Sequence, residues 1–446
     1  MSMPNKSYLT TKSFDRLPEE LAVTNAHLID KAEKLDAVKT VIIKNGQIDS
    51  IHDQLPDGYK GEQLNGDGCV LMPGWFDMHV HFREPGREDE ETLQTGSFAA
   101  ANGGFTGVAC MPNTQPAIDS QEVINYILER TENNLVDVHP VAAITCGRQG
   151  EQLAPIAEMA EAGAVAISDD GSPLMNAELM RRALEYSKMF ELPILGHEED
   201  ANLSKNRHMH EGFYSTKLGI AGIPAISEEI FIARDIMLTT YTGGRFHVCH
   251  ISTKDGVDLV RQAKAKGLPV TCEVTPHHFT LTDKAVESYD THTKMSPPLR
   301  SEEDRQALLE GLRDGTIDAI ATDHAPHSIE EKEAEYIYAP FGITGLETAV
   351  GLIISQLVEQ DVLSVQDLYD KCVANPRKIL TLAIPKIARG ETANLTLFNP
   401  SLTWKFKDIR SFSKSQNTPF KEFPLKGKPL AVINKGQIFI SPDLKK

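Results

Sequence analysis

The stretch GWFDMHVHF, residues 74–82, is largely apolar and carries two histidines near its end. Its length and composition fit a buried β-strand. Side chains two apart on a strand point to the same face, so His79 and His81 project together, and Arg83 follows in the same phase. Such a pair offers two ligands to one metal ion, although two hydrogen-bonded histidines beside a core would give the same pattern.

Short β-rich runs like this one recur along the chain, with helical stretches between them. The helical patterns include NAELMRRALEYSKMFE (176–191), KDGVDLVRQAKAKG (254–267) and SEEDRQALLEGLRDG (301–315). Strands that alternate with helices are typical of parallel βα units, and eight units predict an α/β fold, a closed (β/α)8 TIM barrel. An open doubly wound sheet is the alternative, but no GxGxxG loop supports it. The eight runs are 74–82, 106–114, 137–145, 163–170, 192–199, 245–252, 268–278 and 317–327.

Both ends of the chain are rich in predicted strands. KNGQI (44–48) and NKGQI (434–438) are typical of hairpin turns between two strands. Chain ends commonly lie close together. We therefore expect residues 1–70 and 391–446 to form one small β-sandwich-like domain beside a barrel domain of residues 71–390.

Composition restricts the partners. The chain has 446 residues, with 45 Lys and Arg against 63 Asp and Glu, a formal net charge of −18. This charge argues against nucleic acid or an anionic membrane surface, and an anionic substrate would need a local cationic pocket. The six cysteines form no CxxC pair, and neither a signal peptide nor an 18-residue apolar run is visible. These features predict a cytoplasmic enzyme.

The other predicted strands also end in residues that bind metals. Asp169 and Asp170 end the fourth strand, His197 the fifth, His250 the sixth and Asp323 the eighth. An unpaired carboxylate would be costly to bury at these positions, whereas imidazole and carboxylate are normal zinc ligands. The set is too large for one tetrahedral ion. It predicts two adjacent ions that share a bridging carboxylate.

Two segments carry a family resemblance. DMHVHFREPG (77–86) and ATDHAPH (321–327) closely resemble the two signatures of the dihydroorotase family, within the cyclic amidohydrolases. The resemblance covers most of the chain, through segments such as SDDGSP (168–173), GHEED (196–200) and APFGITGLET (339–348). It implies an enzyme of pyrimidine (UMP) biosynthesis that reversibly cyclises N-carbamoyl-L-aspartate to L-dihydroorotate with two zinc ions per chain.

The resemblance also implies roles for the ligands. Asp170 would bridge the two ions, with Asp169 as the rival bridge. The carbamylated lysine that bridges the ions in many cyclic amidohydrolases is not available, because no lysine occurs between Lys60 and Lys188. Asp323 would also be catalytic, moving a proton from the nucleophile to the departing ring nitrogen. The implied ligands are His79, His81 and Asp323 for the first zinc, and His197 and His250 for the second.

Arg83 indicates the substrate. A guanidinium binds a carboxylate in a bidentate manner, and dihydroorotate carries a ring carboxylate that dihydropyrimidines and hydantoins lack. An ion pair with Glu84 or Glu88 is the alternative for Arg83. Ser296 stands where close relatives often have asparagine. The resemblance implies further substrate contacts from Asn113, Ser296, His327, Phe341 and Gly342.

Two alternative functions stay open. One is a related cyclic amidohydrolase, a dihydropyrimidinase, hydantoinase or allantoinase. The substrate of such an enzyme would offer no carboxylate for Arg83 to bind. The other is an inactive homologue that serves as a structural partner of aspartate transcarbamoylase, which would be expected to have lost metal ligands. The expected ligand is a small anionic substrate, and the expected assembly is a homo-oligomer (a dimer). An association with aspartate transcarbamoylase is a further hypothesis.

Overall fold

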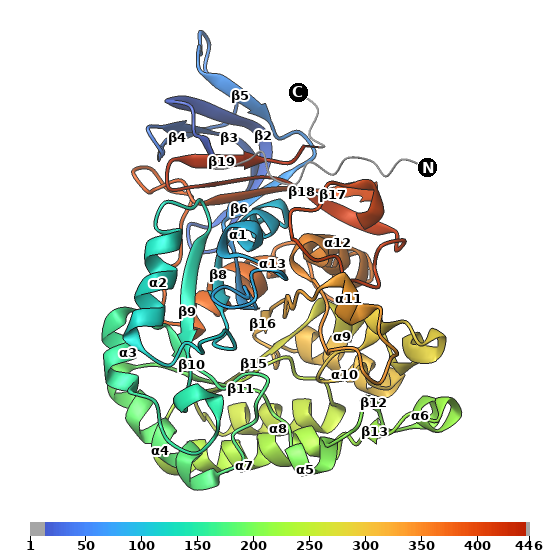
Figure 1. Cartoon of the computed structure of the whole chain (residues 1–446). Coiled ribbons are helices and arrows are strands. Elements are labelled where there is room, and N and C mark those ends of the chain that lie inside the picture. Colours follow the sequence, from blue (N-terminus) through green and yellow to red (C-terminus); the bar gives the residue numbers. More distant parts are fainter. Residues whose placement is uncertain (1–13, 443–446) are drawn as a thin grey trace.

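A computed structural model describes residues 14–442 of the chain. Eight parallel strands form one sheet in chain order. The first and last segments meet through a parallel bridge between Val80 and His324, where the His81 N–H donates to the His324 carbonyl at 2.8 Å. The sheet therefore closes into the predicted TIM barrel (Figure 1). Its strands are β7 (Trp75–Val80), β8 (Phe105–Cys110), β9 (Asp137–Ala142), β10 (Ala166–Ile167), β11 (Ile194–Gly196), β14 (Phe246–Val248), β15 (Val270–Val274) and β16 (Ala319–Ile320).

Helices surround the barrel. Asn176, Thr253 and Ser301 each accept a backbone N–H at the start of a helix, so all three helices predicted from the sequence are present. The helices of the ring are α1 (Leu93–Asn102), α2 (Gln121–Thr131), α3 (Ile156–Ala162), α4 (Ala177–Ser187), α7 (Ile226–Thr242), α8 (Lys254–Ala265) and α10 (Glu302–Arg313), followed by α11 (Ile329–Lys332), α12 (Ala349–Ile353), α13 (Asp367–Tyr369) and α14 (Asn375–Ile379).

An insertion between β11 and α7 was not predicted. It contains α5 (Ala201–Ser204), β12 (Met209–His210), α6 (Phe213–Leu218) and β13 (Gly222–Ile223), and its two short strands pair with each other. A further short helix, α9 (Pro276–Thr280), follows β15. Ser204, Arg207, His208 and Ile223 of this insertion line a cavity that also contains residues from the C-terminal ends of the barrel strands.

Strands from both chain ends build a second, nine-stranded sheet. Apolar side chains of β2, β3, β17 and β18 pack into one cluster, as expected for a sandwich-like unit. As domain boundaries, residues 70/71 and 390/391 stay predictions. The strands are β1 (Asp15–Arg16), β2 (Glu20–Asp30), β3 (Leu35–Lys44), β4 (Gln47–His52), β5 (Glu62–Asn65), β6 (Val70–Pro73), β17 (Leu395–Trp404), β18 (Leu425–Asn434) and β19 (Gln437–Ile440).

Both predicted hairpin turns are confirmed. The β3–β4 hairpin turns at Asn45 and Gly46, and the β18–β19 hairpin turns at Lys435 and Gly436. All four residues have positive φ, between 50° and 77°, as two-residue hairpins of the type I′ class require.

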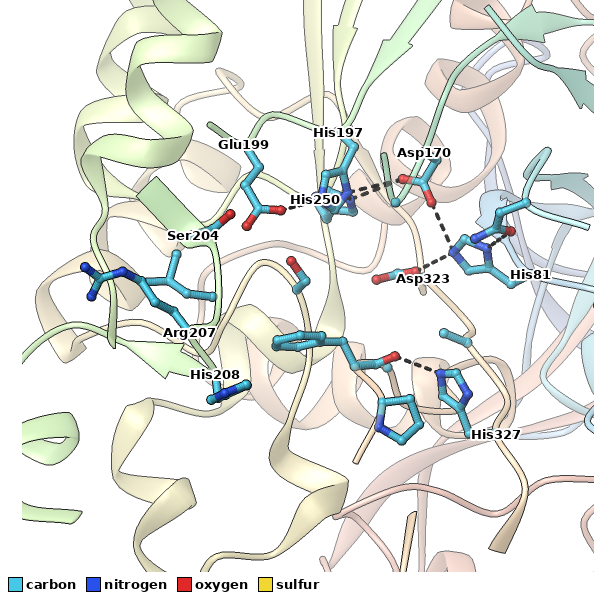
Figure 2. Close-up of a pocket in the computed structure, with 18 of the residues that line it drawn as sticks. His81, Asp170, His197, Glu199, Ser204, Arg207, His208, His250, Asp323 and His327 are labelled. Carbon is cyan, nitrogen blue, oxygen red and sulfur yellow. Dashed lines mark hydrogen bonds and ion pairs between the residues drawn. The ribbon is translucent and has the colours of Figure 1, made fainter. Parts of the chain in front are cut away.

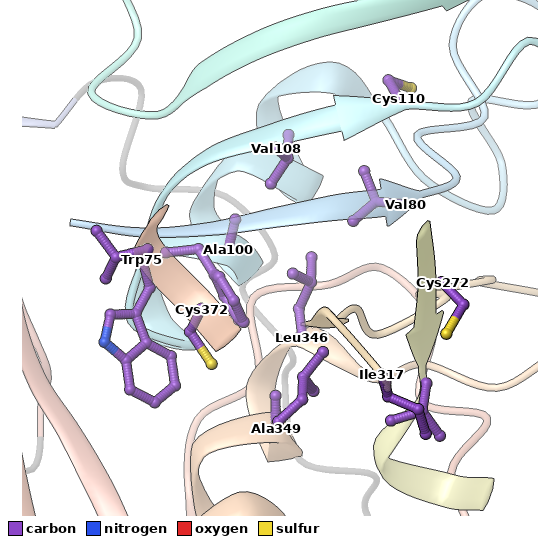
Figure 3. Close-up of a cluster of buried hydrophobic side chains, with 14 of the residues drawn as sticks. Trp75, Val80, Ala100, Val108, Cys110, Cys272, Ile317, Leu346, Ala349 and Cys372 are labelled. Carbon is purple, nitrogen blue, oxygen red and sulfur yellow. The ribbon is translucent and has the colours of Figure 1, made fainter. Parts of the chain in front are cut away.

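The two units join at Gly74, between β6 and β7. A Cβ at this position would lie 1.9 Å from Oδ1 of Asn394 and 2.0 Å from Oγ1 of Thr106, so only glycine fits. The adjacent Trp75 is fully buried and packs edge-on against Phe105 and Phe398. Figure 3 shows Trp75 with Val80 and Val108 among the apolar side chains between strands and helices. This packing fixes β7, which carries the first two candidate ligands.

No helix within residues 14–442 combines the length and apolar character that a membrane span requires.

Candidate metal centre and active site

The candidate ligands meet at the C-terminal ends of the barrel strands. Two groups of side chains have ligand atoms within 4.8 Å of one another, His79, His81 and Asp170 in one, and Asp170, His197 and His250 in the other. Asp170 belongs to both groups. Figure 2 shows its carboxylate between His81 on one side and His197 and His250 on the other.

The distances suit a cation between the side chains rather than hydrogen bonds. Oδ1 of Asp170 lies 3.5 Å from the nearest nitrogens of His79, His197 and His250, and Oδ2 lies 3.5 Å from Nε2 of His81. Two ligands of a tetrahedral zinc ion, each bonded at about 2.0–2.1 Å, are about 3.3–3.4 Å apart. Asp323 completes the set, with Oδ1 2.9 Å from Nε2 of His81.

Among the described residues of this cluster, buried polar atoms without a hydrogen-bond partner include Nε2 of His79, Oδ1 of Asp170 and Nδ1 of His250. Buried polar atoms are nearly always paired. Burial opposes the charge on Asp170, but His79, His197 and His250 hold the pKa of its carboxyl well below the usual range. An ionised carboxylate among imidazoles, with unpaired atoms facing one another, fits a divalent metal such as zinc.

Outer partners fix the orientation of three of the imidazoles. Nδ1 of His79 donates to Oε1 of Glu273 at 2.7 Å, and Nδ1 of His81 donates to Oδ1 of Asn113 at 2.7 Å. Nε2 of His197 lies 3.3 Å from Oε2 of Glu199. Each contact occupies one ring nitrogen and leaves the other for the cluster, an arrangement typical of metal sites.

Sequence reasoning missed Glu273. Its side chain is fully buried in β15 and also lies 3.3 Å from Nε2 of His247. Burial opposes its charge, but His79 and His247 lower its pKa to about 2. A glutamate inside the apolar run VTCEV was the available signal, because an ionised side chain is buried only with partners.

Backbone geometry also marks the site. His250 and Asp323 have φ of 32° and 49°, in the left-handed region that non-glycine residues seldom adopt. Such strain persists where surrounding structure enforces it, often at functional sites. The buried carboxylate of Asp77 helps to hold the backbone here, since it accepts the N–H groups of His79 and Thr322 at 3.1 Å. Asp77 thus holds the ends of β7 and of the last strand together.

Asp169 and Asp170 have different surroundings. The Asp169 carboxylate accepts the backbone N–H of Ile144 at 2.9 Å and that of Thr145 at 3.1 Å, and also the Thr145 hydroxyl. Its oxygens are therefore occupied by the turn after β9, whereas those of Asp170 face the histidines.

A cavity of about 600 Å³ opens onto the cluster. On one side it is lined by candidate ligands, among them His81, Asp170 and Asp323. The side chains predicted to bind substrate also line it: Arg83, Asn113, Ser296, His327, Phe341 and Gly342. The structure thus brings every predicted metal and substrate residue to one place, although their roles stay predictions.

Arg83 pairs with neither of the glutamates considered from the sequence. Glu84 instead binds Arg130 at 2.9 Å, and Glu88 accepts the Gly86 N–H. Nε of Arg83 donates to the Pro326 carbonyl and lies 3.3 Å from the buried Glu90. Within residues 14–442 neither Nη atom has a hydrogen-bond partner, so both are available to a ligand in the cavity.

Glu90 belongs to a network of ion pairs rather than to a further metal site. Its carboxylate, with His327 and Glu331, has the spacing of a metal site. However, Arg87 lies 3.2 Å from Glu90 and 3.0 Å from Glu331, and Arg83 adds a second cation. The charges are already balanced by arginine. Burial and the charge of Arg83 lower the pKa of His327 to about 3, which keeps its imidazole neutral.

The Phe341–Gly342 wall is held by the protein's own contacts. The Phe341 carbonyl lies 2.7 Å from Nε2 of His327, and the Gly342 N–H donates to the Lys294 carbonyl at 2.9 Å. The buried Lys332 donates to the carbonyls of Pro340 and Gly342. That these backbone groups contact a ring amide stays a prediction.

The chain is similar in sequence and structure to several known proteins. A family model described as dihydro-orotase-like matches residues 68–256. The dihydroorotase of Pelotomaculum thermopropionicum is 52% identical over 84% of this chain and 88% of its own length. The dihydroorotase of Syntrophus aciditrophicus is 45% identical over 95% of this chain and 100% of its own. Among solved structures, L-hydantoinase from Arthrobacter aurescens aligns over 96% of both chains with a TM-score of 0.81 at 23% identity, which supports the fold.

The chain has a TIM barrel with a cluster of histidines and aspartates at its strand ends, and it is similar to dihydroorotases and to a hydantoinase. It is therefore a metal-dependent cyclic amidohydrolase. The relatives that share 45–52% of its sequence over most of its length are dihydroorotases. The chain belongs to the dihydroorotase family.

Replacement of the two neighbouring aspartates separates their roles. We expect Asp170→Asn to lose most bound metal, because the charge shared by four imidazoles is removed. Asp169→Asn should keep the metal and lose stability, by about 1–3 kcal/mol, since it disturbs the buried turn at Ile144 and Thr145. Elemental analysis and thermal unfolding of both variants measure this, and metal loss confined to Asp169→Asn would reverse the assignment.

Glu273→Gln tests the outer partner of His79. The amide keeps the shape of the side chain but removes the charge that orients the imidazole, so metal affinity should fall about 10- to 100-fold. Competition with a chelator gives the affinity. Glu347→Gln is the matched control, because Glu347 is also buried and hydrogen-bonded but binds Asn102 and Ser411. Equal losses in both variants would show a general effect of the substitution.

Proposed function

We propose that the chain catalyses the reversible cyclisation of N-carbamoyl-L-aspartate to L-dihydroorotate, a step of pyrimidine biosynthesis, with two zinc ions. One observation carries the proposal: Arg83, whose Nη atoms have no hydrogen-bond partner within residues 14–442, lines the same cavity as the histidine and aspartate cluster. Dihydroorotate combines a cyclic amide with a carboxylate. A metal cluster and a guanidinium in one cavity match those two groups.

We assign His79, His81 and Asp323 to one ion, His197 and His250 to the other, and Asp170 to both. Bound at these residues, zinc would activate water near neutral pH and polarise the amide carbonyl. Glu273, Asn113 and Glu199 keep three imidazoles in the orientation that this requires.

Asp323 is assigned the proton transfer. Its side chain lines the cavity and its backbone is held in the left-handed region, which fixes the carboxylate beside His81. In ring opening, Asp323 would take the proton of the attacking water and give it to the departing ring nitrogen. In cyclisation the same carboxylate moves the proton in the opposite direction.

Arg83 is assigned to the substrate carboxylate, with Asn113 and His327 as its neighbours in the cavity. Asn113 already accepts from His81, so its amide nitrogen is the group left for substrate. The neutral His327 avoids a second fixed charge beside Arg83. Ser296 and the backbone of Phe341 and Gly342, which line the same cavity, would contact the ring.

The alternatives are less well supported. A hydantoinase or dihydropyrimidinase acts on an uncharged ring and would leave Arg83 without a ligand, and the likeness to L-hydantoinase concerns the fold alone. An inactive homologue would not be expected to keep all six ligand side chains in one cluster. The six cysteines are free, which supports a cytoplasmic location. Association with aspartate transcarbamoylase stays a prediction.

The direct experiment is ring opening of dihydroorotate, compared with dihydrouracil and allantoin, by protein of known metal content. We expect turnover of dihydroorotate to exceed that of both uncharged rings. A preference for dihydrouracil or allantoin would favour the related amidohydrolases, and absence of all three activities in metal-loaded protein would favour the inactive homologue.

Arg83→Met tests the carboxylate contact. A charge-assisted contact is worth roughly 1.5–3 kcal/mol, so kcat/KM for dihydroorotate should fall about 10- to 100-fold. Metal content should be unchanged, and any activity on dihydrouracil should fall much less. Arg87→Met is the matched control, because Arg87 also pairs with Glu90 but does not line the cavity. Equal proportional losses on both substrates would mean that Arg83 supports only the network around Glu90.

A further inference from the structure

Two lysines lie buried beside the cavity of the candidate active site. Lys294 is 2% exposed and Lys332 is 3% exposed. A buried ammonium is normally paired with a carboxylate. Within residues 14–442 neither ammonium forms an ion pair, and Asp290, whose charge acts on Lys332, lies 2.7 Å from Nδ1 of His292 instead. Burial lowers the pKa of Lys332 to about 7 and that of Lys294 to about 8, so both charges are kept at a cost.

Backbone carbonyls take the place of a carboxylate around Lys332. Its Nζ donates to the Pro340 carbonyl at 2.9 Å and to the Gly342 carbonyl at 3.0 Å, and it lies 3.5 Å from the Lys294 carbonyl. An ammonium has three N–H donors, and each of these carbonyls can accept one of them. Lys332 is the last residue of α11, so its side chain ties this helix to the residues on both sides of Phe341.

Lys294 binds the same stretch of chain through other groups. Its Nζ donates to the carbonyls of Tyr336 and Ile337 at 2.8 and 2.9 Å, and it lies 4.7 Å from the centre of the Phe341 ring. A cation at this distance is attracted by the face of an aromatic ring. The Lys294 carbonyl also accepts the Gly342 N–H at 2.9 Å. The side chain and the backbone of Lys294 thus both bind the stretch that ends in the Phe341–Gly342 wall.

Gly342 has a conformation and a position that need such support. Its φ is 128°, in the region that favours glycine, and a Cβ here would lie 2.8 Å from Cβ of Ala325 and 3.1 Å from Nε2 of His327. Besides Lys332, its carbonyl accepts an N–H of the Asn417 amide at 3.1 Å. Oδ1 of Asn417 in turn accepts the His327 N–H at 3.1 Å. A shift of Gly342 would therefore be felt directly at His327.

The stretch that carries the wall has no regular structure of its own. Residues 333–342 contain neither a helix nor a strand, although Phe341 and Gly342 line the cavity. Tyr336 packs in an apolar cluster with Met209 of the insertion. Side-chain contacts rather than a ladder of backbone hydrogen bonds therefore set the shape of the wall. Among these contacts, those of the two lysines reach Phe341 and Gly342 themselves.

We propose that Lys332, supported by Lys294, is a positioning residue of the reaction, which holds the Phe341–Gly342 wall at the place where it meets the substrate ring. The inference rests on the proposed function, which puts the ring amide against this wall. Lys332 does not line the cavity itself, so it acts through the carbonyls that it binds. An ammonium buried without an acid costs stability, which argues against a role in stability alone. A displacement of about 1 Å between reacting groups is costly, so a wall fixed by a charged donor favours the reaction.

Hydrogen–deuterium exchange tests the hold on the wall, and it needs no activity. Lys332→Met keeps a side chain of similar length but removes the N–H donors. Peptides that cover residues 333–342 should then exchange at least about 10-fold faster, since hydrogen bonds from a charged donor no longer keep this stretch closed.

The matched control is Lys371→Met. Lys371 is also buried and donates to a backbone carbonyl, that of Ile317, but this carbonyl precedes β16 at the opposite end of the barrel. The control should leave exchange in residues 333–342 unchanged.

Turnover of dihydroorotate by the metal-loaded protein tests the role in the reaction. In Lys332→Met the ring should be misplaced relative to the metal cluster, while Arg83 still binds the carboxylate. We therefore expect kcat to fall about 10- to 100-fold, KM to change by less than about 3-fold, and metal content to stay the same. Lys371→Met should keep kcat even if it unfolds at a lower temperature. Lys332→Gln is shorter but keeps N–H donors, so it should lose less kcat, and it serves the same test if the methionine variant folds poorly.

The outcomes separate this inference from the proposed function. Unchanged exchange in residues 333–342 of Lys332→Met overturns the hold on the wall, whatever the activity. Faster exchange with unchanged kcat overturns the role in the reaction, as does an equal loss of kcat in Lys371→Met. If the metal-loaded wild type does not turn over dihydroorotate, the proposed function fails, while faster exchange still supports the hold of Lys332 on the wall.

Discussion

The structure depends on one buried carboxylate. Asp170 is almost completely buried, yet four imidazoles surround it at 3.5 Å. An ionised carboxylate is buried only where cations or donors compensate it. Asp323 and Glu273 add two further buried carboxylates nearby, and no lysine or arginine within residues 14–442 forms an ion pair with any of the three. The divalent ions that we propose at this cluster would supply positive charge to balance these carboxylates.

The topology of the barrel brings these groups together. Parallel strands end at one edge, so His79, Asp170, His197 and His250 reach one point although they are far apart in the sequence. The last strand closes on the first through Val80 and His324, and Asp77 binds both strand ends. The substrate side is built on the same edge, where Glu90 holds Arg83 with His327. The candidate metal ligands and Arg83 are therefore held at the same edge of the barrel.

Much of this could be predicted from local patterns. The eight strands, the helices after residues 176, 253 and 301, and both hairpin turns depend on periodicity, caps and turn residues, which are local. The grouping of the candidate ligands followed from their places at strand ends. Glu273 could not be assigned, because its partner His79 is distant in sequence. Arg83 pairs with Glu90 rather than with Glu84 or Glu88. The sequence could not show this, because the path of the loop after Arg83 decides which glutamate lies beside it. The insertion of residues 201–223 lacks clear periodicity.

The central claim is that Asp170 is shared by two metal ions. It is tested most directly by anomalous diffraction from crystals of the zinc-loaded protein, measured on both sides of the zinc absorption edge. The account predicts two peaks, both at bonding distance from Asp170, one beside His79 and His81 and the other beside His197 and His250. A single peak, or two peaks of which only one contacts Asp170, would contradict it.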